Sequence, residues 1–113
     1  MSYYLDKATD LPLQEVFPGI TGRIVHTERT TIADFSIAAG TELPLHHHPH
    51  EQTSTVLTGE FLFVINGEER LLRAGQVAVI PANAPHRGRA VTACRIIDVF
   101  APVREDYRVD HGR

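Results

Sequence analysis

The sequence has little of several features that define large classes of protein. It contains a single cysteine, Cys94, which excludes an internal disulfide framework. The first seven residues hold no apolar run that could act as a signal peptide or a membrane span. Lys and Arg are scattered over a chain of net charge −3, so we expect neither nucleic acid nor an anionic membrane surface as a partner. Together these absences favour the reducing cytoplasm as its location.

No helical period is sustained anywhere, and the chain has no internal repeat, low-complexity tract or linker. Short apolar or alternating segments recur instead, separated by Gly, Pro and Asn, as is typical of an all-β sandwich or barrel. The clearest local signal is Asn66-Gly67, because this pair accepts the positive φ angles of a two-residue hairpin turn. At 113 residues, we expect the chain to form one domain, residues 1–113. The predicted strands are residues 22–28, 31–37, 45–48, 52–58, 60–65, 69–73, 77–80, 86–90 and 94–101.

The two ends of the chain carry separate predictions. Residues 1–20 hold more apolar surface than a free tail needs, including Tyr3, Leu5 and Phe17, and we expect them to lie along the barrel or against a second subunit. An open barrel edge beside such a segment favours a twofold homodimer in which the segment adds to the partner's sheet. Residues 108–113 are expected to be a loose end.

Histidines gather in residues 40–52, which read Gly-Thr-Glu-Leu-Pro-Leu-His-His-His-Pro-His-Glu-Gln. Side chains two apart on a strand share a face, so His46 and His48 can aim two imidazoles at one point while His47 turns away. Taken alone, this run also fits a His-rich exposed loop. The segment 75–86 argues against that, because its Pro-x4-His spacing places a third imidazole, His86, at the start of another strand. The sequence therefore predicts a metal site built from separate β-segments.

These two motifs resemble those of the cupin superfamily, in which Gly-x5-His-x-His-x3-ligand is followed by Gly-x5-Pro-x4-His. The resemblance covers residues 40–59 and 75–86 and, through the strand pattern, most of the chain. It implies a small β-barrel of jelly-roll topology with one divalent metal at its mouth. Two positions depart from the family pattern, since Gln52 stands where Glu is usual and Asn83 where Gly is usual. The metal ligands that the resemblance implies are His46, His48, Gln52 and His86.

His50 is a rival for the place of the fourth ligand, because it has the same parity as His46, His48 and Gln52. A straight strand advances roughly 6.6 Å per two residues, so four such positions cannot all reach one ion with bonds of about 2.1 Å. Some bend is required, and Pro49 supplies one. We place His50 at the rim of the pocket. The alternative is that His50, and not Gln52, is the fourth ligand.

A neutral Gln52 in place of Glu removes one negative charge next to the metal. At an effective dielectric constant near 20, a unit charge about 4 Å away is worth on the order of 4 kcal/mol, so the metal stays more electropositive. This favours Lewis-acid chemistry and disfavours oxidation of the ion to a trivalent state. Imidazole and amide oxygen suit many metals, so the predicted cofactor is one divalent transition metal, which could be Zn, Ni, Mn, Fe or Co.

The last predicted strand, residues 94–101, places a carboxylate in an otherwise apolar row. Asp98 shares its face with Cys94, Ile96 and Phe100. A carboxylate there is costly unless it is paired or used. If this face lines the barrel cavity, Asp98 is a candidate general acid or base. The pattern equally fits the opposite arrangement, in which this face meets solvent and the core contains Ile97 and Val99.

Residues 98–107, together with the His-x-His-x3-Gln motif, resemble the small single-domain cupins of the KdgF type, which act in pectin and alginate breakdown. Those proteins open the ring of 4,5-unsaturated monouronates to give a linear keto acid. The resemblance implies a metal-dependent enzyme for a small anionic carboxylate substrate, with Asp98, Phe100 and Arg104 as catalytic residues. An arginine suits this task physically, because a planar guanidinium binds a carboxylate in a bidentate manner.

Other interpretations stay open at this stage. Phe100 fits a core residue as well as a platform for a sugar, and Arg104 could pair with Glu105 or Asp106 in a surface contact of little energy. Two other functions also fit the sequence, a metal-dependent cupin dioxygenase and a non-catalytic cupin that binds a small molecule. Two further arginines are candidates for binding the carboxylate, Arg87 and Arg89.

Overall fold

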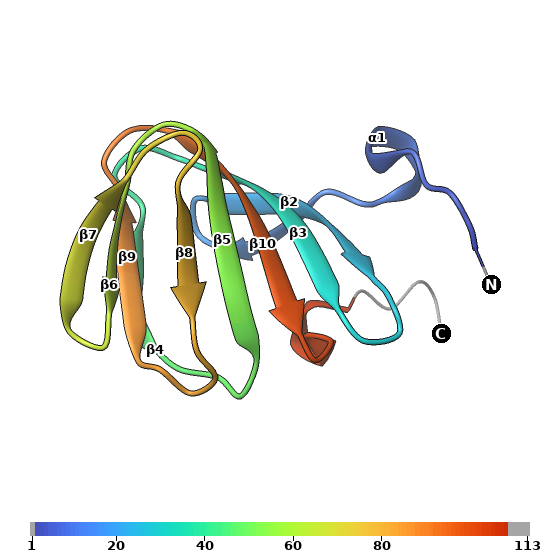
Figure 1. Ribbon diagram of the computed structural model, residues 1–113. Coiled ribbons are helices and arrows are strands. Elements are labelled where there is room, and N and C mark those ends of the chain that lie inside the picture. The colour runs from blue at the N-terminus through green and yellow to red at the C-terminus, as the bar shows by residue number, and fades with distance from the viewer. Residues whose placement is uncertain (1, 109–113) are drawn as a thin grey trace.

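The computed structural model describes residues 2–108, and they form two antiparallel β-sheets that face each other (Figure 1). In hydrogen-bonded order, the larger sheet contains β1 (Gln14–Phe17), β2 (Ile20–His26), β3 (Thr31–Ile37), β10 (Cys94–Ala101), β5 (Glu51–Thr58) and β8 (Val77–Ile80). The smaller sheet contains β4 (Glu42–His46), β9 (His86–Ala90), β6 (Phe61–Ile65) and β7 (Glu68–Leu72). Two short helices complete the described chain, α1 (Lys7–Asp10) and the 3₁₀-helix η1 (Glu105–Tyr107).

The core lies between the two sheets and is built by alternation along the strands. In β3, Ala33, Phe35 and Ile37 are buried while the residues between them face outward. The smaller sheet contributes Phe61 and Phe63, whose ring centroids lie 4.6 Å apart. Burial of these two inner faces against each other confirms the predicted all-β jelly-roll architecture.

Most predicted strands are present. Strands β3, β8, β9 and β10 have the predicted bounds, and β2, β5, β6 and β7 are shifted by one or two residues at their ends. The hairpin between β6 and β7 is also confirmed, because Asn66 and Gly67 have φ angles of 51° and 79° and Ile65 pairs with Glu68.

The structure corrects the predicted strand at residues 45–48. Strand β4 covers Glu42–His46, and the chain then leaves the sheet until β5 begins at Glu51. Pro49 lies in this turn, where its missing N–H removes no ladder hydrogen bond. His46 and His48 therefore do not share one strand, and the bend expected from Pro49 begins before His48.

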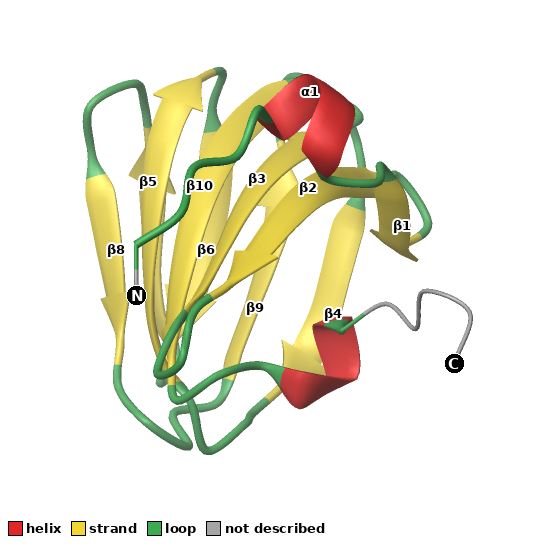
Figure 2. Cartoon of the chain, turned by 90° about the vertical axis from the view of Figure 1, so that its right-hand side faces the viewer, coloured by secondary structure: helices red, strands yellow, loops and turns green. Residues whose placement is uncertain are grey.

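The described part of the N-terminal segment lies on the outside of the larger sheet (Figure 2). The carboxylate of Asp6 accepts hydrogen bonds from the first turn of α1, and Lys7 forms an ion pair with Asp34 on β3. Strand β1, which was not predicted, pairs with β2 of the same chain at the edge of the sheet. Beyond Arg108, the predicted loose end falls outside the described residues. None of the helices within residues 2–108 is long and apolar enough to cross a membrane.

Asp34 gives the fold a predictable acid sensitivity. Its carboxylate accepts hydrogen bonds from Arg95 Nε at 3.0 Å and Arg95 Nη2 at 2.6 Å and pairs with Lys7. The Arg95 guanidinium is the main cause that lowers the pKa of Asp34 from 3.8 to about 2. Because the folded-state pKa lies below the unfolded value, this contribution to stability is complete above about pH 4 and is lost as the pH falls toward 2.

We therefore expect wild type to lose about 1–2 kcal/mol more unfolding free energy than Asp34→Asn between pH 5 and pH 2, after allowance for screening by solvent. Urea denaturation of both proteins across this range measures the difference. If the unfolding free energies of both proteins fall equally with pH, the pairing of Asp34 with Arg95 and Lys7 contributes nothing to the pH dependence of stability.

Candidate metal centre

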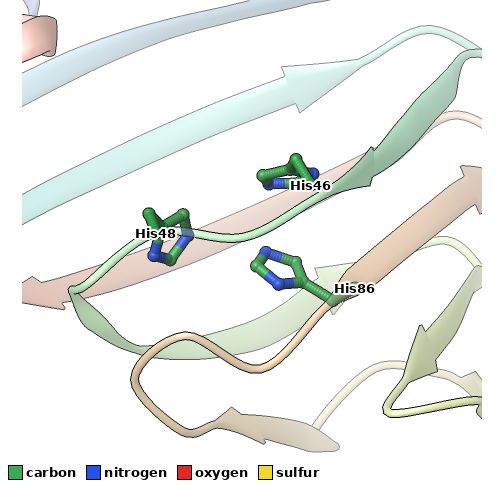
Figure 3. A group of neighbouring side chains, drawn as sticks. All are labelled: His46, His48 and His86. Atoms are coloured by element: carbon green, nitrogen blue, oxygen red, sulfur yellow. The ribbon is translucent and has the colours of Figure 1, made fainter.

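Three histidines meet at one end of the two-sheet roll (Figure 3). His46 is the last residue of β4 and His86 the first of β9, and the two are paired across the sheet. His48 reaches the same point from the turn that follows β4. One ring nitrogen from each histidine lies within 4.8 Å of the others, a spacing that allows all three to contact one cation.

The orientation of the three rings is set by the backbone. Each Nδ1 lies 2.8–3.0 Å from a carbonyl oxygen two residues away in the chain. An Nδ1–H that donates to a carbonyl leaves the Nε2 lone pair free, which is the state in which imidazole binds a metal. The Nε2 of His86 is buried and has no hydrogen-bond partner in residues 2–108, as expected of a ligand atom. The carbonyls belong to Pro44 for His46, His50 for His48 and Ala84 for His86.

Burial keeps two of these imidazoles neutral. It lowers the pKa of His86 from 6.5 to about 4, against the opposing effect of the hydrogen bond to Ala84, and it also lowers the pKa of His48. Neighbouring positive charges, including Arg104, act in the same direction as burial. Because protons compete with a metal for these nitrogens, a neutral pair at pH 7 is ready to bind a cation.

Gln52, the second residue of β5, lies directly beside the histidines and is 7% exposed. Its Nε2 donates to Ser54 Oγ at 2.9 Å and to Asp98 Oδ2 at 3.3 Å, which turns its Oε1 toward His48. This oxygen lies 3.1 Å from His48 Nε2. With the Nδ1–H of His48 donating to a carbonyl, two lone pairs face each other here, and a cation between them would relieve the contact. The donor set of three imidazoles and one amide oxygen thus fits a divalent transition metal.

His50, the alternative fourth ligand, lies next to this group but is not part of it. Its ring packs against His48 with the centroids 5.4 Å apart, and its carbonyl accepts the His48 Nδ1–H. The Nδ1 of His50 is buried with no hydrogen-bond partner in the described chain. Of the two candidates, Gln52 is the one whose oxygen faces a histidine nitrogen.

A cavity of about 330 Å³ opens between the sheets beside the histidines and is also lined by Asp98 and Arg104. Cys94, Ile96 and Phe100 of β10 are buried, so the face of this strand that carries Asp98 points inward. Of the two arrangements left open by the sequence, the structure has the one in which Asp98 lines the cavity.

The Asp98 carboxyl group lies next to the candidate metal ligands. Its Oδ2 accepts from Gln52, and its Oδ1 is buried with no hydrogen-bond partner in residues 2–108. Burial raises the pKa of Asp98 to about 7, while hydrogen bonds from Ser54 and Gln52 and the charge of Arg104 act to lower it. Such a group can hold or release a proton at neutral pH.

Arg104 also lines this cavity and is held between two aromatic rings. Its Cζ is 4.1 Å from the ring centre of Tyr107 and 4.9 Å from that of Phe100. Phe100 is 1% exposed and also contacts the His48 ring, so it supports the arginine and the histidine rather than presenting a free face. Of the acidic partners considered for Arg104, the structure has Asp106, which accepts hydrogen bonds at 2.9 and 2.6 Å.

Three residues of the site were not assigned to it from the sequence. Ser54 could have been found, because it is the next inward position after Gln52 on β5. Tyr107 and Asp106 follow the last strand in a short 3₁₀-helix, where no periodic pattern shows which side chains turn back toward the cavity. Of the two additional arginine candidates, Arg87 lines the cavity and Arg89 is exposed on β9 outside its lining.

Comparison with known proteins agrees with this geometry. The model of a family described as "Cupin domain" matches residues 33–100, more than half of the chain. The pectin degradation protein KdgF of Dickeya dadantii is 30% identical over 93% of this chain and 96% of its own. The solved structure of KdgF from a Halomonas species is 30% identical, with a TM-score of 0.84 over 96% of this chain and 99% of that chain. A cupin structure from Shewanella frigidimarina, described as RmlC-like, is 25% identical, with a TM-score of 0.87 over 95% of this chain and 97% of its own. This chain therefore belongs to the cupin family.

Proposed function

We propose that this cupin is a metal-dependent enzyme that opens the ring of a 4,5-unsaturated uronate, a product of polysaccharide lyases. One observation carries the proposal: a single cavity is lined by a carboxyl group with a pKa near neutrality, a guanidinium and part of a three-histidine group. These are the groups needed to move a proton, hold a carboxylate and bind a metal. The likeness to two KdgF proteins, one of them a pectin degradation protein, supports the choice of substrate.

The substrate is a small carboxylate, and Arg104 is the residue proposed to bind it. The rings of Phe100 and Tyr107 flank the guanidinium and restrict its movement. A fixed planar cation orients a carboxylate through two hydrogen bonds at once. Phe100 thus contributes to the reaction by holding Arg104 and His48 in place.

The metal site is proposed to consist of His46, His48, His86 and the Oε1 of Gln52. A divalent metal bound there would supply Lewis-acid polarisation of a substrate oxygen. The amide of Gln52 adds no charge, so this donor set favours a strongly electropositive ion and does not favour a change of oxidation state. The proposed cofactor is one of Zn, Ni, Mn, Fe or Co, all of which accept imidazole and oxygen donors.

Asp98 is proposed to carry the proton. The reaction is an isomerisation: the proton of the C1 hydroxyl is removed, the bond between C1 and the ring oxygen breaks, and the electron pair stays on that oxygen, which becomes an enolate. A proton is then added at C4, which leaves an aldehyde at C1 and a ketone at C5, with no atom gained or lost. One carboxyl group can take up the first proton and return it at C4, because its pKa of about 7 populates both of its forms.

An absorbance assay tests the proposal. Metal-loaded protein is expected to remove the absorbance of the conjugated enol ether of a 4,5-unsaturated uronate, without consuming oxygen. Unchanged absorbance with wild type would refute ring opening. Oxygen uptake that depends on Fe or Mn would instead support a dioxygenase, and a ligand that binds at the metal and is recovered unaltered would support a non-catalytic role.

Arg104→Gln is expected to lower kcat/KM for the unsaturated uronate by about 10²-fold, mainly through KM, because two charge-assisted hydrogen bonds to the substrate are lost. Arg89→Gln is the matched control, since Arg89 is exposed and lies outside the cavity lining. Steady-state kinetics of both variants measures the difference. Equal KM values for wild type and Arg104→Gln would remove Arg104 from the binding site.

Gln52→Glu is expected to retain the metal but to slow the reaction by about tenfold or more. The change keeps an oxygen that can bind the ion, but it removes the amide that donates to Ser54 and Asp98. It also places a second carboxylate next to Asp98, in the position of the amide. Repulsion between the two carboxylates alters the proton affinity of Asp98. Metal analysis beside rate measurements checks both halves of the prediction, and full activity in Gln52→Glu would show that the amide is not required.

We also propose that the protein is a homodimer formed through the N-terminal segment. Tyr3, Tyr4 and Leu5 are exposed on the outer side of the larger sheet, and β1 leaves an open sheet edge. Apolar surface and an unpaired edge are both features that a second copy could cover. Light scattering after size exclusion at micromolar concentration should give twice the monomer mass, and a monomer mass would refute the dimer.

A further inference from the structure

The carboxylate of Asp106 pairs with Arg104, the residue proposed to bind the carboxylate of the ligand. Arg104 Nε donates to Oδ1 at 2.9 Å and Nη2 donates to Oδ2 at 2.6 Å, the bidentate arrangement in which a guanidinium binds a carboxylate. Both residues line the cavity beside Asp98 and the histidines. A substrate carboxylate that seeks the same two donors therefore meets a carboxylate of the protein already in place.

The two members of this ion pair differ greatly in how firmly they are held. The Arg104 side chain is 11% exposed and lies between the rings of Phe100 and Tyr107. Its backbone N–H donates to the hydroxyl of Thr31, which is fully buried. The Asp106 side chain is 57% exposed, and Arg104 is its one side-chain hydrogen-bond partner within residues 2–108. The arginine is therefore the firmly held member of the pair and the aspartate the more exposed one.

We propose that the Asp106 carboxylate competes with the ligand carboxylate for Arg104. The two groups are chemically alike, and the ligand must displace Asp106 to reach the guanidinium. The proposal rests on the role of Arg104 in the proposed function. In the free protein, Asp106 neutralises a mostly buried cation that would be costly to leave unpaired. A carboxylate ligand gains only the difference between its own pairing with Arg104 and that of Asp106.

This competition makes Asp106 a specificity-determining residue. A simple monocarboxylate makes the same contact as Asp106 and gains little by replacing it. A uronate that also reaches the histidine side of the cavity has additional contacts that favour the exchange. Asp106 thereby restricts the site to carboxylates attached to a body that fills the cavity.

Calorimetric titration of the metal-loaded full chain tests the proposal with two probes, galacturonate and its uncharged methyl ester. Asp106→Asn keeps the shape of the side chain but removes the competing charge. We expect it to bind galacturonate roughly fivefold more tightly than wild type and to bind the ester unchanged. Glu105→Gln is the matched control, because Glu105 lies next in the chain, pairs with Arg108 instead, and loses the same charge.

Each result supports or overturns the proposal. Tighter binding of galacturonate alone, seen in Asp106→Asn and not in Glu105→Gln, supports it. Equal or weaker galacturonate binding by Asp106→Asn overturns it, as does an equal change for both probes, which would mean that Asp106 only shapes the cavity. Arg104→Gln distinguishes failure of the competition proposal from failure of the proposed function. If Arg104→Gln weakens galacturonate binding but Asp106→Asn does not strengthen it, only the competition proposal is wrong. If galacturonate affinity is independent of Arg104, both proposals fail.

Discussion

Replacement of His86 by alanine is expected to abolish binding of the proposed divalent metal and to lower the rate of the proposed ring opening by about 10³-fold. The Lewis-acid contribution of a metal is worth several kcal/mol, and loss of about 4 kcal/mol corresponds to this factor. His86 is 2% exposed, and its Nε2 has no hydrogen-bond partner within the described chain. This nitrogen is the atom proposed to bind the ion. Elemental analysis after dialysis and the absorbance assay measure the two effects.

The matched control is His47→Ala. His47 lies between His46 and His48 in the chain, but its side chain is exposed and it is not a member of the three-histidine group. This variant should keep both metal and activity, which separates a defined ligand set from a His-rich loop that binds metal without order. Equal metal loss in His47→Ala and His86→Ala would contradict the proposed ligands.

Asp98→Asn is expected to lower kcat by about 10²- to 10⁴-fold while the metal is retained, because an amide of the same shape cannot carry the proton. Burial raises the pKa of Asp98 to about 7, so the ionised carboxylate lowers the stability of the fold above that pH. We therefore expect the metal-free variant to have a Tm at pH 8 equal to or above that of metal-free wild type. Kinetics, metal analysis and thermal denaturation measure the three quantities.

Asp34→Asn is the control for this variant. Asp34 lies on β3 opposite Ile97 of β10, on the outer face of the same sheet. Its loss should change acid stability and leave kcat at neutral pH unchanged. Activity retained in Asp98→Asn would assign the proton transfer to another group, and a Tm below the assay temperature would show that its loss of activity arises from unfolding.

Local patterns predict a large part of the fold correctly, and the errors have physical causes. Alternation and turn residues locate β3, β8, β9 and β10, where one face packs in the core. Strand β1 has no fully buried residue and no alternation of buried and exposed positions, so its pattern does not indicate it, whereas the equally short edge strand β8 alternates. The bounds of β4 depend on where the chain leaves the sheet before Pro49, which is a property of the turn and not of the strand.

The candidate site, like the fold, is predictable from the sequence only in part. His46 and His86 are predictable because the two motifs place them at the paired ends of two strands, while His48 was predicted from alternation along a strand but reaches the site from the turn after β4. The orientation of Gln52 is not predictable, because it depends on donation to Ser54 and to a residue on β10, far along the chain. For Phe100 and Arg104, the sequence leaves open whether the phenylalanine is a core residue and whether the arginine pairs with a neighbouring acid, and the structure has a buried phenylalanine and an arginine paired with Asp106.

Anomalous scattering from a crystal of metal-loaded protein tests the central claim most directly. The predicted result is one ion bound by the Nε2 atoms of His46, His48 and His86 and by Oε1 of Gln52, with each Nδ1 still directed at its backbone carbonyl. An ion that uses His50 or an Nδ1 atom, or a centre that stays empty in the presence of excess Zn, Ni, Mn, Fe and Co, would contradict it.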